Sequence, residues 1–405
     1  MRVVMLTQYL GADGRGMIGG IARSMARRGV QVHIIAGRGI GETHPDSPVS
    51  ASQRYADAGG TPVSISRVPF YNSHDTSALR RTATYASFSA ASSIAARKQL
   101  AKADVVLVYG SPATAAAAAL LAHRTRGTPY VLLVQDVWPD SVFASGFLRE
   151  GLAHSAANHS LSRFVAAIYR SASSVVAISP GMRDLLVARG VEPARASYIY
   201  NWDYRSEERD QVTVPTRQPG DPLVLMYAGN IGRAQNLHAV IGAVRRCGPG
   251  VQLIIIGSGA EEPEICRRIA DQGINNVTLR DHVSPDALNL LRSQAHLHLV
   301  SLADEPLFRV TLPSKLQSLM ASGAPILAFA PGEASELVVR SGAGITCDPC
   351  DEDGLLAALE SARRLDSSQL AAMGARGRRF YEQSMTEEVN GDRLYAALAA
   401  GADSR

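Results

Sequence analysis

Short runs of apolar residues alternate along most of the chain with longer segments in which apolar residues recur at helical spacing. A buried parallel strand is a short apolar run, and the helix that leads to the next parallel strand has one apolar face. The pattern therefore predicts an α/β fold of the Rossmann-like, doubly wound type. The strands of a first series are expected at 3–6, 32–36, 105–109, 131–134 and 175–178.

A second series starts after residues 205–221, a polar linker rich in charge, Thr and Pro. Its strands are expected at 223–228, 253–256, 277–279, 297–302 and 325–330, and its helices near 236–246, 261–272, 285–293, 314–322 and 333–341. A helical pattern from about 355 to 399 has no strand after it. We expect two facing domains, at 1–204 and 222–380, with an interdomain cleft between them, and a helix at 381–405 that returns to the first domain.

Composition narrows the class of protein. The 405 residues carry a net charge of +4, with 46% hydrophobic and 19% charged residues, which excludes a disordered chain and a coiled coil. No apolar run approaches the roughly 20 residues of a membrane-spanning helix, and the first is too short for a secretory signal. These features predict a cytoplasmic protein with at most peripheral membrane contact. The scattered arginines argue against nucleic acid as a partner.

The cysteine and histidine pairs of the sequence do not form a recognisable metal or catalytic site. Cys347 and Cys350 form a C-x-x-C pair without a second ligand pair nearby, so a structural role is favoured over a zinc or redox site. His296 and His298 alternate on one expected strand, and core positions are favoured over metal ligands. The chain has no G-x-S-x-G, H-E-x-x-H or P-loop motif, and we expect neither a metal nor a cofactor.

The segment 312–326 joins a strand to a helix and then, through a Gly, to another strand. Ser314 and Gln317 have the spacing of a capping box, and Pro313 precedes them. The N–H groups of a helix N-terminus and the charge of Lys315 together suit a diphosphate. The alternative is an ordinary capped helix with a surface lysine.

We expect the counterpart of that helix start in YAGNIGRAQ at 227–235, the end of a strand followed by two glycines and an arginine. Gly229 and Gly232 would let the backbone approach a ligand, and Arg233 would bind phosphate oxygens. A tight structural turn is the alternative. The similar turn at 257–259 is expected to be structural.

In the first domain, a glycine-rich loop at 11–20 follows the first strand and either holds a sugar or phosphate or is a simple connection. The segment QDVWPDS at 135–141 follows a buried strand, and Asp136 either faces the cleft or caps the next helix. Tyr9, Gly14, Gly16, Gln135 and Trp138 are the residues of this domain that we expect to face the cleft.

Together these segments resemble the retaining glycosyltransferases of family 4, which have GT-B architecture. The resemblance runs along nearly the whole chain and is carried by the segments 175–190, 200–203, 227–235, 253–259, 276–278, 313–315 and 320–325. The stretch DVWPDS at 136–141 resembles bacterial surface-polysaccharide transferases that act on amino sugars such as N-acetylfucosamine.

The resemblance implies a metal-independent, retaining transfer from a nucleoside-diphosphate sugar, with UDP or GDP as the nucleotide. It also implies that the domain at 222–380 binds the nucleotide sugar and the domain at 1–204 binds the acceptor, so that Tyr9, Gly14, Gly16, Gln135 and Trp138 would lie on the acceptor side. Arg233, Lys315 and Asp136 would be catalytic, and the implied donor-binding residues are Gly229, Asn230, Gly232, Gln235, His282, Val283, Pro313, Ser314 and Ser318. Many members of the family have glutamates at the positions of Val310 and Ser318.

The acceptor is either a lipid-linked glycan intermediate or a soluble natural-product intermediate. The segment 80–102 is rich in Ala, Ser and Thr and offers a poor face for membrane insertion. A non-catalytic sugar-nucleotide binding protein and a GT-B epimerase or phosphorylase remain alternatives to a glycosyltransferase.

Overall fold

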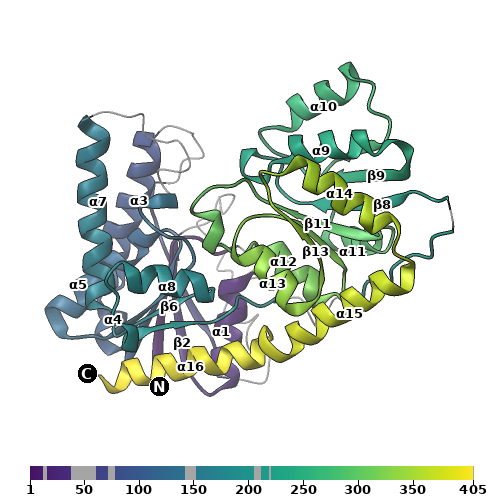
Figure 1. Ribbon diagram of the computed structural model, residues 1–405. Coiled ribbons are helices and arrows are strands. Elements are labelled where there is room, and N and C mark those ends of the chain that lie inside the picture. Colours follow the sequence, from purple (N-terminus) through teal and green to yellow (C-terminus); the bar gives the residue numbers. More distant parts are fainter. Residues whose placement is uncertain are drawn as a thin grey trace. The chain divides into compact units, whose positions relative to one another are not determined.

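The computed structural model describes residues 1–11, 16–37, 61–71, 78–141, 152–204, 211–218 and 220–404. The chain forms two compact units, the first comprising Met1–Tyr204 with Glu387–Arg405 and the second Arg205–Thr386. Each unit contains one parallel sheet with helices between its strands, so the predicted Rossmann-like α/β class is confirmed (Figure 1). None of the described helices is long and apolar enough to cross a membrane.

Unit 1 is built on a seven-stranded sheet in which every pairing is parallel. The direction of winding reverses between β1 and β4, which are neighbours in the sheet. In such sheets ligands bind beyond the carboxyl ends of the strands at this reversal point. In spatial order the strands are β3 (Ser64–Val68), β2 (Gln31–Gly37), β1 (Arg2–Thr7), β4 (Val105–Gly110), β5 (Tyr130–Val134), β6 (Ser174–Ala177) and β7 (Ala196–Tyr198).

The helices of unit 1 connect these strands and bury apolar faces against them. Helix α1, for example, buries Ile21, Ala22 and Met25 completely. The helices are α1 (Met17–Arg27), α3 (Ala78–Ala95), α4 (Arg97–Lys102), α5 (Ala117–Arg126), α7 (Leu152–Ser171), α8 (Pro180–Ala188) and α16 (Glu387–Asp403).

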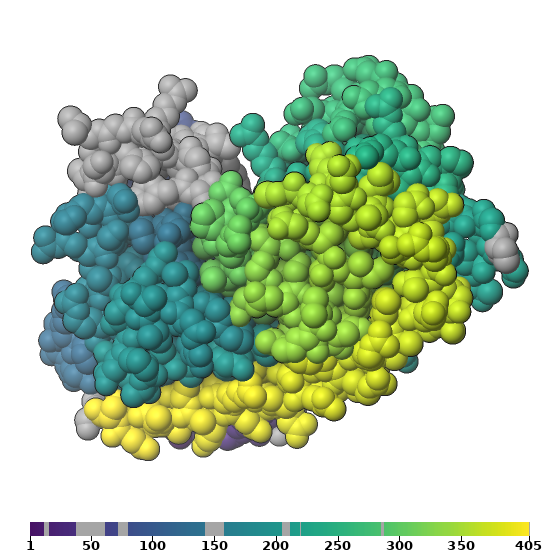
Figure 2. All heavy atoms as spheres, viewed as in Figure 1, coloured from purple at the N-terminus to yellow at the C-terminus, as the bar shows by residue number. Residues whose placement is uncertain are grey.

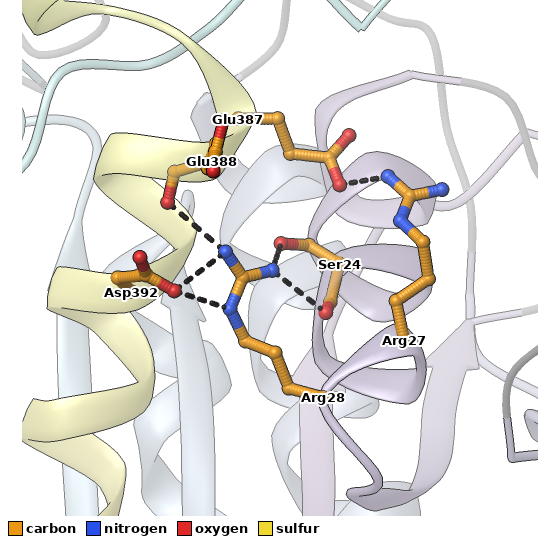
Figure 3. A network of polar contacts seen from close by, with 6 residues as sticks. All are labelled: Ser24, Arg27, Arg28, Glu387, Glu388 and Asp392. Carbon is orange, nitrogen blue, oxygen red and sulfur yellow. Dashed lines mark hydrogen bonds and ion pairs between the residues drawn. The ribbon is translucent and has the colours of Figure 1, made fainter.

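The C-terminal helix α16 packs on α1 and on strands β4, β5 and β6 of unit 1. Arg28, the C-cap of α1, donates to the carboxylate of Asp392 (2.8 Å) and to the carbonyl of Glu388 (3.0 Å), as Figure 3 shows. Arg27 forms an ion pair with Glu387 in the same network. A Cβ added to Gly391 would lie 2.4 Å from Ser24 Oγ, so the two helices touch closely there. The other side of α16, yellow in Figure 2, lies at the surface.

Unit 2 is built on a six-stranded parallel sheet whose winding reverses between β8 and β11. Its core is dominated by Leu, Ile and Val from these strands and from α9 and α14. In spatial order the strands are β10 (Val277–Arg280), β9 (Val251–Ile256), β8 (Leu223–Ala228), β11 (Leu297–Ser301), β12 (Ile326–Phe329) and β13 (Gly344–Cys347). The helices are α9 (Leu237–Arg246), α10 (Glu262–Asp271), α11 (Pro285–Arg292), α12 (Ser314–Ala321), α13 (Glu333–Ser341), α14 (Glu352–Arg363) and α15 (Ser367–Ser384).

The two histidines of the central strand region are core residues. His298 is 2% exposed, and burial lowers its pKa to about 3, so the ring is neutral at physiological pH. His296 is also buried, and its Nδ1 accepts a hydrogen bond of 2.9 Å from the backbone N–H of Val224. This geometry supports the structural interpretation of both side chains.

Candidate functional site

Lys315 is the most unusual charged residue of unit 2. Its Nζ is buried and has no hydrogen-bond partner among the described residues. It lies 3.6 Å from the centroid of the Tyr227 ring, and a Cβ added to Gly229 would be 3.1 Å from it. Burial lowers the pKa of Lys315 to about 7. A buried ammonium without a partner is costly, so this arrangement favours a negatively charged ligand at Gly229.

The loop 229–235 is braced at the reversal point of the sheet. Gln235 Oε1 accepts from the N–H of Gly232 (3.1 Å) and from Asn230 Nδ2 (3.2 Å). The hydroxyl of Ser301, at the end of β11, donates to the carbonyl of Gln235 (2.5 Å). The hydroxyl of Tyr227 donates to the carbonyl of Asn230 (2.6 Å). The loop is therefore tied to the carboxyl ends of both β8 and β11, where a ligand is expected.

Arg233 belongs to the same loop and, unlike Lys315, has a carboxylate near its side chain. The Arg233 side chain is 95% exposed, and its Nε lies 3.6 Å from Glu261 Oε1. An exposed guanidinium on a braced loop can turn toward an anion. The structure thus attaches both predicted cations to one loop, Lys315 beside Gly229 and Arg233 as a member of it.

The turn at 257–259 supports this loop directly. The N–H of Gly229 donates to Ile256 (2.9 Å), and the N–H of Ile231 donates to Ser258 (2.9 Å). Gly257 has φ +142°, and a Cβ there would lie 2.0 Å from the carbonyl oxygen of Gly229. The glycine is therefore required for close contact between the two loops, as its structural interpretation predicts.

Substitution Gly257→Ala should displace the loop 229–235 and reduce anion binding at Lys315 at least about 10-fold, because a 2.0 Å contact with backbone must be relieved. We expect unit 2 to lose about 2–3 kcal/mol of stability as well. Gly273→Ala is a matched control, since Gly273 also has positive φ (+56°) but nothing lies within 4 Å of its added Cβ. Titration of each variant with an anionic ligand measures the affinity, and thermal unfolding measures the stability. Equal losses in Gly257→Ala and Gly273→Ala would contradict the claim that the loop 229–235 requires a glycine at 257.

The start of α12 differs from the predicted capping box. Ser314 is the first residue of the helix rather than its cap, and Pro313 is the N-cap, with no side-chain cap hydrogen bond. The N–H of Leu316 turns back to the carbonyl of Pro313 (2.9 Å). The first N–H groups of a helix have no acceptor within the helix, so this end can still receive an anion. The capping-box prediction is wrong, while the position of the helix start is confirmed.

The other residues predicted to bind the nucleotide sugar differ in their exposure and contacts. Ser318 is buried, accepts from Arg292 (3.3 Å) and donates to the carbonyl of Lys315 (3.0 Å). His282 is exposed after β10, and Val283 packs against the small cluster that contains Met226 and Ile256. These contacts leave His282 available to a ligand and make Val283 mainly a packing residue.

A hollow of about 380 Å³ lies at the carboxyl ends of β12 and β13. It is lined in part by Asp304, Arg309, Glu336 and Asp348, and Arg309 donates to both oxygens of Asp304 (2.7 and 2.8 Å). Cys347 also lines it, and burial raises the pKa of its thiol to about 12. A thiol of this kind is a poor nucleophile and metal ligand, which favours a structural role for Cys347.

In unit 1, the predicted catalytic residue Asp136 and the predicted acceptor-side residue Gln135 follow β5 at the carboxyl edge of the sheet. Asp136 is exposed and accepts a hydrogen bond of 2.5 Å from the hydroxyl of Ser111, which follows β4. Gln135 forms a reciprocal amide pair with Asn201 (2.8 and 3.3 Å). Asp136 therefore presents a carboxylate oriented from a neighbouring strand end. Ser111 and Asn201 were not predicted, although both also follow strands.

The other acceptor-side residues are less uniform. Tyr9 is 47% exposed, and Gln8 donates to its hydroxyl (2.9 Å). Trp138 is buried edge-on against the ring of Tyr85, 5.4 Å between centroids, so it packs in unit 1 rather than offering a face. Gly16 is the N-cap of α1 with φ +103°, and Gly14 lies outside the described residues.

Two family models match the sequence, a glycosyl transferase 4-like domain over residues 17–202 and glycosyl transferases group 1 over residues 208–380. Together they span most of the chain and correspond to the two units. The chain therefore belongs to the glycosyltransferases of GT-B fold, the class that its motifs resemble.

Named relatives and solved structures agree with this assignment. WbjE of Pseudomonas aeruginosa, named as a probable glycosyltransferase, is 25% identical over 303 residues, covering 73% of this chain and 74% of that protein. WcaI of Escherichia coli K12, named for colanic acid biosynthesis, is 24% identical over 339 residues, covering 80% and 81%. Anabaena HepE in complex with UDP-glucose has a TM-score of 0.66 at 16% identity, covering 99% of this chain and all of that one. Sucrose-phosphate synthase of Thermosynechococcus elongatus has a TM-score of 0.70, also at 16% identity and with 99% of each chain covered. At such identities the structural likeness concerns the fold alone.

Proposed function

We propose that this glycosyltransferase moves a sugar from a nucleoside-diphosphate sugar to an acceptor hydroxyl, with retention of anomeric configuration and without a metal ion. The observation that carries the proposal is the buried, unpartnered Nζ of Lys315 beside Gly229, at the reversal point of the unit 2 sheet. A diphosphate would supply the anion that this ammonium lacks among the described residues.

The chemistry follows from the charge that develops during transfer. The bond between the sugar C1 and a phosphate oxygen breaks, and its electron pair stays on the diphosphate. The acceptor oxygen bonds to C1, and its proton passes to the diphosphate or to solvent. Lys315, Arg233 and the N–H groups at the start of α12 would stabilise the leaving diphosphate, because preorganised donors act most strongly where charge grows.

The acceptor would bind to unit 1, where Asp136 is exposed and oriented by Ser111. We propose that this carboxylate accepts a hydrogen bond from the acceptor hydroxyl and orients it. Among the structural neighbours, HepE was solved with UDP-glucose, which supports UDP as the first nucleotide to test. The acceptor is a lipid-linked glycan intermediate, for which the name of WcaI, with its reference to colanic acid biosynthesis, gives support; a soluble natural-product intermediate is the alternative.

Isothermal titration with UDP, GDP and dTDP, with AMP as a control, tests the donor class. We expect one diphosphate to bind in the presence of EDTA. Its sugar conjugate should then yield a product whose anomeric configuration, measured by NMR, is that of the donor. Failure of every nucleoside diphosphate to bind would exclude the proposed donor class, and binding without turnover over a broad acceptor panel would favour a non-catalytic protein.

A further inference from the structure

Glu261 is a charged residue at the loop 229–235 that the proposed mechanism has not used. Its side chain is only 17% exposed, and its Oε1 is the carboxylate oxygen 3.6 Å from Arg233 Nε. The backbone N–H of Glu261 donates to the carbonyl of Ile231 (3.0 Å). Both the backbone and the side chain of Glu261 therefore lie against the loop that carries Arg233.

The Glu261 carboxylate is itself held in place from α9 and α10. His238 Nε2 lies 3.4 Å from Glu261 Oε2. Arg268 donates to His238 Nδ1 (3.2 Å) and to its backbone carbonyl (2.8 Å). A guanidinium can only donate, so Nδ1 must accept and the proton of the neutral ring lies on Nε2, facing Glu261. Arg268 thus fixes a histidine that donates toward the carboxylate.

The position of this proton decides whether His238, Glu261 and Glu264 can form a metal site. The ligand atoms of His238, Glu261 and Glu264 lie within 4.8 Å of one another, which is close enough for a metal ion. However, Nε2 carries the proton and Nδ1 is occupied by Arg268, so neither ring nitrogen offers a lone pair to a metal. The cluster is therefore better explained by the charge of Glu261 acting on Arg233.

We propose that Glu261 promotes release of the nucleoside diphosphate product by competing with its phosphates for Arg233. This inference rests on the proposed function. The ion pair between Arg233 and Glu261 is long and its guanidinium is almost fully exposed, so it is weak enough to yield to a diphosphate. When the ligand leaves, the carboxylate provides a position to which Arg233 returns.

This competition weakens binding of the nucleoside diphosphate product more than binding of the sugar donor. When the sugar leaves, the nucleotide gains about one further negative charge on its terminal phosphate. The additional charge strengthens the attraction between the terminal phosphate and Arg233, so product binding depends on this guanidinium more than donor binding does, and loses more when Glu261 competes for it. Glu261 therefore weakens product binding selectively, which a transferase needs in order to turn over.

Substitution Glu261→Gln tests this inference, because the amide keeps the size and shape of the carboxylate while the charge is lost. We expect the Kd of UDP to fall about 5-fold and that of UDP-glucose to fall about 2-fold or less, measured by isothermal titration at pH 7.5. GDP and GDP-mannose replace them if the wild-type chain selects GDP. Glu264→Gln is the matched control, since Glu264 lies one helical turn further along α10 and has no ion pair with Arg233. We expect it to change either Kd less than 2-fold.

Combining the substitution with Arg233→Ala separates the proposed competition from simple repulsion. We expect the 5-fold gain to fall below 2-fold when Arg233 is absent. Unchanged or weaker UDP binding by Glu261→Gln, an equal gain for donor and product, or a full gain without Arg233 would each overturn the inference while leaving the proposed function intact. If the wild-type chain binds no nucleoside diphosphate, the proposed function and this inference both fail.

Discussion

Substitution Lys315→Met should reduce nucleoside-diphosphate affinity and kcat/KM at least ~10-fold while making unit 2 more stable. Charge-assisted hydrogen bonds to phosphate contribute about 1.5–3 kcal/mol, which sets the lower bound on the loss. The gain in stability has a separate cause. Because the buried Nζ has no partner among the described residues, replacing it with an apolar side chain of similar length removes a desolvation cost.

The stability gain should be about 2–4 kcal/mol near pH 7, since each unit of pKa shift corresponds to about 1.4 kcal/mol. Thermal unfolding and titration of the same samples measure the two effects together. Lys98→Met is the matched control, because Lys98 is exposed on α4 and should change neither quantity. Normal affinity in Lys315→Met would remove Lys315 from the site, and a loss of both affinity and stability would show that the residue is structural.

Donor binding should weaken as pH rises above 7, because only the protonated form of Lys315 attracts phosphate and burial lowers its pKa to about 7. We expect the Kd of the nucleoside-diphosphate sugar to rise about 10-fold between pH 7 and 8.5. A donor is the better probe because both its phosphates are diesters and do not titrate in this range, whereas the terminal phosphate of a free diphosphate does.

Folding stability should change with pH in the opposite direction. The pKa of Lys315 is lower in the folded than in the unfolded chain, so the unfolded chain binds the extra proton between about pH 7 and 10. Stability therefore rises with pH in this window, by about 1.5–2 kcal/mol between pH 7 and 8.5. Both pH effects should disappear in Lys315→Met. A donor Kd that is constant from pH 7 to 8.5 in the wild-type chain would contradict the assigned role of the ammonium.

Most of the fold could be predicted because its central strands are continuous apolar runs. The strand at 105–110 is buried nearly throughout, and four consecutive apolar residues end the strand at 251–256; both runs are visible in the sequence. The edge strands β3, β7 and β13 were not predicted. None of the three is buried throughout: β3 contains two Ser and an Arg, β7 is three residues long with an exposed Ser197, and β13 begins with Gly. At the edges of a sheet, pairing with a neighbour rather than local composition decides the structure.

The site was located from its glycine turns, but its energetics depend on contacts between distant segments. Lys315 is buried by Tyr227 and Gly229, which lie more than eighty residues earlier in the chain, and no local pattern shows this. The capping box failed because Pro313 takes the N-cap position and leaves Ser314 inside the helix. Glu261 was missed for a related reason: its role depends on Arg268 fixing His238, a relation between two helices.

A crystal structure of the chain with its bound nucleoside diphosphate tests the central claim most directly. We expect phosphate oxygens within hydrogen-bond distance of Lys315 Nζ and of the N–H groups at the start of α12, with Arg233 turned from Glu261 toward the ligand. A diphosphate bound elsewhere, with the Lys315 ammonium still unpartnered against the Tyr227 ring, would contradict the account.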